Sequence, residues 1–119
     1  MLRTILTWSA AVLLGVLFVL VGFSKIAGPS GAGWAVRLSR WGYPAASRFA
    51  IGGVEILAGL GLLVPPLRRW AAIAVLVVMS GALATHLLHA EFVRVLPPLL
   101  LGGLAFGLYF WQPRGTTRT

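Results

Sequence analysis

The stretch "GVEILAG" (residues 53–59) places a carboxylate, Glu55, inside a run of otherwise apolar residues. The chain has only two acidic residues among its 119, Glu55 and Glu91. An ionised side chain inside a bilayer is costly unless another group pairs with it. The helix that supplies this partner to Glu55 therefore decides how the chain packs.

The composition indicates a membrane protein. Hydrophobic residues make up 59% of the chain, and the mean hydropathy is +0.94. Apolar runs fill residues 1–112, which we expect to form one transmembrane domain, followed by a disordered tail at 113–119. The net charge of +8 does not indicate nucleic acid binding, because the basic residues lie singly or in pairs at the ends of the apolar runs, where lipid headgroups attract them. The chain has no cysteine, which excludes thiol chemistry and disulfides.

Four apolar runs are predicted to cross the bilayer as helices, since a hydrocarbon core of about 30 Å needs about 20 helical residues. Prolines follow the second run and open the fourth, where they end and begin helices. A cleaved secretory signal is the alternative for the first run, although Lys25 directly follows its long apolar core. The predicted fold class is an all-α bundle of four transmembrane helices, at residues 4–26, 45–64, 70–89 and 95–111.

A short interfacial helix is predicted between the first two spans. Trp34, Leu38 and Trp41 share one side of a helical wheel, and Arg37 and Arg40 flank it. This pattern is typical of a helix that lies in the membrane interface with its apolar side toward the lipid. A loop anchored by the two tryptophans is the alternative.

Four spans place both termini on one side of the membrane. Cytoplasmic segments carry the excess of Lys and Arg. The terminal side has five basic residues outside the spans and the opposite side has four, which predicts cytoplasmic termini: Arg3, Arg68, Arg69, Arg114 and Arg118 against Arg37, Arg40, Arg48 and Arg94.

The ionisable side chains within the spans lie in one half of the membrane. The first run ends at Lys25, and the second begins near Arg48 on the same side, so Glu55 lies roughly 10 Å into its span. The third run returns to this side with His86 and His89. We therefore expect Glu55 to face the bundle interior and to pair with Lys25, and we predict Glu55, Lys25 and His86 as catalytic residues.

Further residues are predicted to bind a ligand. Gly22 shares a helix face with Lys25, and Gly52 and Gly59 share one with Glu55, so the two helices can approach closely. Met79 and Ala82 lie on the same helix face as His86. His89 is expected in the headgroup region, near Glu91. We assign no metal site, because the two histidines share one helical face and few other ligands are available. The predicted ligand-binding residues are Gly22, Gly52, Gly59, Met79, Ala82 and His89.

Two features leave alternatives open. The Lys25–Glu55 pair is either a purely structural contact or part of a ligand or proton site. The motif "GLAFG", with Gly103 and Gly107, either docks the fourth helix inside the bundle or joins two protomers in a homo-oligomer.

Three stretches together resemble the DoxX family of small four-helix bacterial membrane proteins: "GFSKIAGP", "RWGYPAASRFAIGGVEILAGLGLLVP" and "RRWAAIAVLVVMSGALATHLL". The most specific positions are Gly22 with Lys25, and Glu55, whereas His86 fits less exclusively. The resemblance implies a four-helix bundle with a polar pocket in the bacterial cytoplasmic (inner) membrane. It also implies a quinone, or a membrane oxidoreductase complex, as ligand or partner.

Three functions follow as hypotheses. In the first, the Lys25–Glu55–His86 pocket binds a quinone or a lipid-like molecule in a redox-associated role. In the second, the protein is a non-catalytic subunit or assembly factor of a larger membrane complex. In the third, it is a membrane enzyme that performs acid–base chemistry on a lipophilic substrate.

Overall fold

The computed structural model describes residues 1–111, and this part of the chain is helical with no strand, which confirms the predicted all-α class. The predicted tail at 113–119 lies outside the described residues. Two short 3-10 helices, η1 (Pro65–Leu67) and η2 (Phe92–Val95), precede the last two α-helices. The α-helices are α1 (Leu2–Ile26), α2 (Gly28–Arg40), α3 (Ser47–Leu62), α4 (Arg68–Leu88) and α5 (Leu96–Phe110).

Glycine and proline set the helix boundaries. Ala27 is extended and Gly28 has a φ of 66°, a conformation that favours glycine, so the chain turns sharply between α1 and α2. Proline lies in the first turn of α2, η1 and α5, where its missing N–H breaks no helical hydrogen bond. Pro65 also disfavours helical geometry at Val64, which is extended, and α3 therefore ends at Leu62.

Three segments are long and apolar enough to cross a membrane: Leu2–Ile26, Pro65–Leu88 and Phe92–Phe110. They match the first, third and fourth predicted spans. The helix in the second predicted span, α3, has only 16 residues, because the chain first turns at 45–46 and then meets Pro65. At 1.5 Å per residue α3 is about 24 Å long, shorter than the hydrocarbon core of a typical bilayer.

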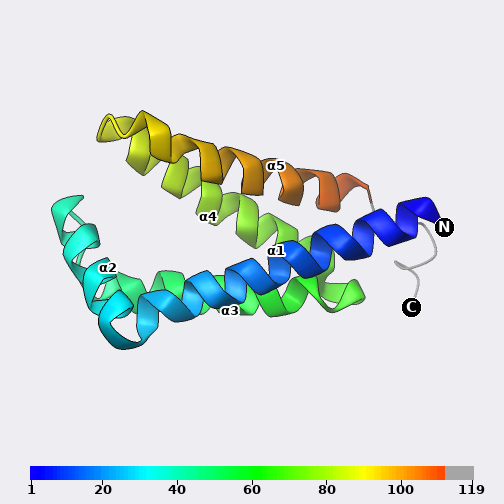
Figure 1. The fold of residues 1–119 in the computed structure, drawn as a ribbon, viewed down its shortest axis with the longest axis horizontal. Coiled ribbons are helices and arrows are strands. Elements are labelled where there is room, and N and C mark those ends of the chain that lie inside the picture. Colours follow the sequence, from blue (N-terminus) through cyan, green and yellow to red (C-terminus); the bar gives the residue numbers. More distant parts are fainter. Residues whose placement is uncertain (112–119) are drawn as a thin grey trace.

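The helices form two pairs that meet at the end of the molecule where the N-terminus lies (Figure 1). In Figure 1, α1 and α3 lie side by side, α4 and α5 form a hairpin, and α2 lies at the opposite end. The Thr7 hydroxyl is 3.3 Å from the carbonyl oxygen of Trp111, so the last described residue returns to the first turns of α1. The core residues come from all four long helices: Ala11, Leu14, Phe18, Ala58, Leu62, Ala71, Ala72, Val75, Ala105 and Leu108.

Glycines allow α1 and α3 to approach to backbone contact. A methyl group added at Gly52 would lie 2.6 Å from the carbonyl oxygen of Gly22, and one added at Gly59 would lie 2.6 Å from that of Gly15. These separations are shorter than any normal contact of a Cβ atom. The two helices can therefore pack this closely only without side chains at these positions.

The buried position of Arg68 corrects the prediction that this residue marks the water interface. Its side chain is fully buried at the start of α4. The Nε atom donates a hydrogen bond of 2.8 Å to the carbonyl of Leu62, and the guanidinium lies 4.4 Å from the ring centroid of Trp8. Nη1 and Nη2 have no hydrogen-bond partner within residues 1–111. Because η1 turns the chain back toward α3 and α1, the first residue of α4 faces these helices rather than solvent.

Substitution of Gly52 by alanine is expected to destabilise the protein by about 1–3 kcal/mol, because the new methyl group meets a backbone carbonyl that cannot move aside. Gly53→Ala is the matched control, since a methyl group there has no neighbour within 4 Å. Thermal unfolding in detergent measures both. Equal unfolding temperatures for the two variants would contradict the close α1–α3 contact.

Candidate functional site

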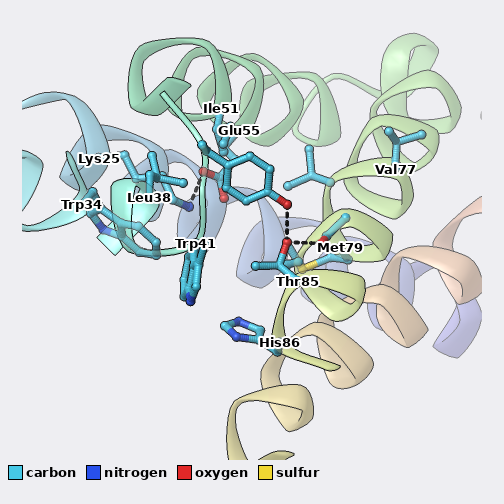
Figure 2. Close-up of a pocket in the computed structure, with 14 residues that line it drawn as sticks. Lys25, Trp34, Leu38, Trp41, Ile51, Glu55, Val77, Met79, Thr85 and His86 are labelled. Atoms are coloured by element: carbon cyan, nitrogen blue, oxygen red, sulfur yellow. Dashed lines mark hydrogen bonds and ion pairs between the residues drawn. The ribbon is translucent and has the colours of Figure 1, made fainter. Parts of the chain in front are cut away.

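A cavity of about 300 Å³ lies at the α2 end of the molecule, lined from α1, α2, α3, α4 and the turn after α2. Figure 2 shows Lys25, Trp41, Glu55 and His86 around this space, although they come from three helices and the turn after α2. Lys25, Glu55 and His86, which the sequence predicts as catalytic residues, all line it. Their catalytic role stays a prediction.

Lys25 and Glu55 form a buried ion pair across the α1–α3 contact. Nζ of Lys25 is 2.5 Å from Oε1 of Glu55, and the two residues are 7% and 1% exposed. The ammonium also lies 4.4 Å from the ring centroid of Trp34, over its negative face. The structure therefore pairs Glu55 with Lys25 in the interior, as the sequence predicts.

His86 connects the cavity to the turn between α4 and α5. Its Nδ1 atom is 2.9 Å from Oε1 of Glu91, and its ring packs edge-on against Trp41 with centroids 5.4 Å apart. Arg94 approaches the second oxygen of Glu91 at 3.4 Å. The hydrogen bond from His86 lowers the pKa of Glu91 below its ordinary value, and the positive charge of Arg94 acts in the same direction.

The other predicted ligand-binding residues lie in three different places. Met79 and Ala82 line the cavity, beside Ile51, Val77 and Val78. His89 is not among the residues that line it. His89 donates from Nδ1 to the carbonyl of Thr85, and it is His86 rather than His89 that bonds Glu91. The remaining predicted residues, Gly22, Gly52 and Gly59, lie in the α1–α3 contact instead.

The apolar face of α2 lines the cavity, so the prediction that this face points toward the lipid is wrong. Trp34, Leu38 and Trp41 share a side of the helix as predicted, but this side lines the cavity, and Leu38 is only 3% exposed. The helical pattern was a sufficient signal for the shared face. It could not show where the face points, because an apolar face suits a cavity as well as lipid.

A hydrogen-bonded pair between Tyr43 and Thr85, which the sequence analysis missed, links the turn after α2 to α4. The two hydroxyl oxygens are 2.7 Å apart, and Thr85 Oγ1 also lies 2.9 Å from the carbonyl oxygen of Gly81 (Figure 2). This contact holds the turn over the cavity. Neither residue belongs to a pattern that would have distinguished it from an ordinary turn or helix residue.

The arrangement suits an amphipathic ligand. One end of the cavity carries the charged groups of Lys25 and Glu55, and the rest is predominantly apolar and aromatic. Such a pocket, with a few polar groups in an apolar wall, is typical of small-molecule sites. Within residues 1–111, no group of three or more His, Cys, Asp or Glu side chains is placed to hold a metal ion.

Comparison with known protein families gives a match. The family model described as the DoxX-like family matches residues 9–108, which include every residue that lines the cavity. No curated protein and no solved structure matches the chain.

Breaking the ion pair from one side is expected to destabilise the protein by about 3–5 kcal/mol, because Glu55→Leu leaves the buried Lys25 ammonium without a counter-charge. The double variant Lys25→Met with Glu55→Leu should recover most of this loss. Thermal unfolding in detergent measures both variants. Arg94→Met, which breaks the more exposed pair with Glu91, serves as the control and should lower the unfolding temperature far less than Glu55→Leu. A double variant no more stable than Glu55→Leu would contradict a mutual pair.

The Glu91–His86 contact should make stability depend on pH. Because the pKa of Glu91 is lowered in the folded protein, its carboxylate stabilises the fold fully above the ordinary value of 4.5, and this contribution is lost as the pH falls through the lowered pKa. Unfolding temperatures of the wild type and Glu91→Gln, measured from pH 7 to pH 3, should differ above 4.5 and converge below it. A constant difference across this range would contradict the role of Glu91.

Proposed function

The chain belongs to the DoxX-like family, and from this membership and the cavity we propose that it is a four-pass membrane protein that binds a small amphipathic molecule at the Lys25–Glu55 pair. One observation carries the proposal. A buried ion pair lies in the wall of a cavity whose remaining surface is predominantly apolar. A purely structural pair needs no such space beside it.

In this proposal α3 also crosses the membrane, in addition to the three segments that are long enough to span it. It packs along α1, which is long enough to span, and it leads through η1 into α4, which also spans. Local thinning of the bilayer accommodates its short length. Four passes place both termini on one side, which in this proposal is the cytoplasmic side of a bacterial inner membrane.

The proposed ligand is a quinone or a lipid-like molecule. Its polar head lies by Lys25 and Glu55, and its apolar part contacts Ile51, Val77 and Met79. Glu55 accepts a hydrogen bond or a proton, Lys25 keeps the opposite charge beside it, and His86 exchanges protons with the outside through Glu91. Electron transfer in a redox-associated role runs through the bound quinone, as electron acceptor, or through a partner protein, since the chain has no cysteine.

One observation favours a second candidate, a non-catalytic subunit or assembly factor of a larger membrane complex. Gly103 and Gly107 on α5 have no atom within 4 Å of an added methyl group, in contrast to the glycines between α1 and α3. This open space supports the docking role for the "GLAFG" motif over a role in packing inside the bundle. Small residues on an open helical face suit docking on another transmembrane helix.

Native mass spectrometry of the detergent-solubilised protein, with solvent extraction, tests the proposal. The wild type and the control Gly53→Ala should carry a discrete quinone or lipid-like mass, and the folded Lys25→Met with Glu55→Leu double variant should lose it. The absence of a bound molecule from both wild type and double variant would contradict the proposal and favour the docking subunit. Retention by the double variant would place the ligand elsewhere.

A further inference from the structure

The end of the bundle where the N-terminus lies carries positive charges that no acidic side chain balances (Figure 1). Arg68 and Arg69 begin α4 at this end. Glu55 and Glu91, the two acidic residues of the chain, both bond cationic side chains at the cavity end. The acidic side chains of the protein therefore supply no counter-charge to the start of α4.

Arg68 leaves most of its hydrogen-bonding capacity unused within the described part of the chain. Its Nε atom donates to the carbonyl of Leu62 at 2.8 Å, whereas Nη1 and Nη2 are buried and have no partner within residues 1–111. A buried charge is costly unless other groups pair with it and accept its hydrogen bonds. The planar fork of a guanidinium matches the oxygens of a phosphate group, which can accept two of its bonds at once.

The position of Arg68 along its helix brings it close to the lipid headgroups. Arg68 is the fourth residue of the apolar segment Pro65–Leu88, so at 1.5 Å per residue its backbone lies roughly 5 Å from the end of that segment. The ring of Trp8 lies over the guanidinium with its centroid 4.4 Å away, and Trp8 is itself 38% exposed. On this side, one indole ring separates the guanidinium from the surface of the bundle.

Arg69 extends the positive charge toward α5. Its side chain is exposed, and its guanidinium lies 5.3 Å from the ring centroid of Tyr109. The first two residues of α4 thus present one buried and one exposed guanidinium, each beside an aromatic ring of a neighbouring helix. Long basic side chains at the ends of membrane helices reach toward headgroups, and basic pockets between such helices bind anionic lipids.

From these charges and contacts we propose that the start of α4 binds the phosphate group of an anionic phospholipid. Nη1 and Nη2 of Arg68 donate to the phosphate oxygens when the indole of Trp8 moves aside, and Arg69 adds a second positive charge beside them. A zwitterionic lipid carries the same phosphate together with a cationic group, which Arg69 repels. This site lies at the opposite end of the bundle from the cavity and does not depend on the proposed function.

Three probes test this site: dioctanoyl phosphatidylglycerol, dioctanoyl phosphatidylcholine and inorganic phosphate. Calorimetric titration into the detergent-solubilised wild type should show phosphatidylglycerol binding at least about tenfold more tightly than either of the others. Equal affinities for the two lipids would overturn the preference for an anionic lipid. Inorganic phosphate that binds as tightly as phosphatidylglycerol would assign the site to a free anion and overturn the lipid as its ligand.

Arg68→Met keeps a long side chain without the guanidinium, and it should weaken phosphatidylglycerol binding by about tenfold. Arg40→Met is the matched control, because it removes the same charge from an exposed residue at the α2 end of the molecule. This control should leave the affinity unchanged. Equal weakening in both variants would reduce the binding to general charge attraction and overturn the assigned role of Arg68.

Trp8→Ala keeps the guanidinium and removes the ring that covers it, so it tests the site even if Arg68→Met does not fold. A phosphate group then reaches Arg68 without displacing the cation–π contact, and phosphatidylglycerol binding should strengthen by about threefold. Unchanged or weaker binding in Trp8→Ala would overturn the buried guanidinium as the lipid contact.

Discussion

The ion pair between Lys25 and Glu55 is the interaction on which the arrangement of the helices depends. A carboxylate inside a helix this apolar must find a positive charge, and within residues 1–111 the lysine at the end of α1 meets it at 2.5 Å. This pairing fixes the position of α1 along α3. Gly22 and Gly52 make it possible, because they let the two backbones touch one turn away from the charges. Since α1 ends at Ile26 and turns at Gly28, the pair also determines where α2 folds back.

The two ends of the molecule are built differently. At the end where the N-terminus lies, α1, α3, α4 and α5 meet in a core of mostly small residues, closed by Arg68 under Trp8. At the other end α2 and the turn that follows it contribute aromatic residues, and a cavity is left between them and α4. Packing at the closed end stabilises the fold, so the open end can keep a space that a well-packed core would fill.

The helices and the ion pair could be predicted from the sequence, because apolar length, proline positions and the shortage of acidic residues leave few arrangements. The lining of the cavity depends on which way each helix face and side chain points, and local sequence patterns do not determine this. The face of α2 was recognisable, but its turn toward the cavity follows from the bend at 41–46, where Gly42 has a φ of 89°. The sequence predicts Arg68 at the membrane interface, but η1 turns the chain so that its side chain is buried in the bundle. The contacts of Tyr43 with Thr85, and of His86 with Glu91, join segments whose relative rotation no periodicity determines.

The sequence left open whether Lys25 and Glu55 serve structure or ligand binding, and the geometry removes the need to choose. Packing needs only one oxygen of the carboxylate, because Lys25 contacts Oε1. A carboxylate has acceptor capacity beyond one bond, and Glu55 lines the cavity as well as the helix contact. A residue fixed by a structural pair is also held in place for a ligand without further loss of side-chain entropy on binding. The same pair can therefore stabilise the bundle and present a preorganised acceptor, and the cavity beside it is the feature that a structural role alone does not explain.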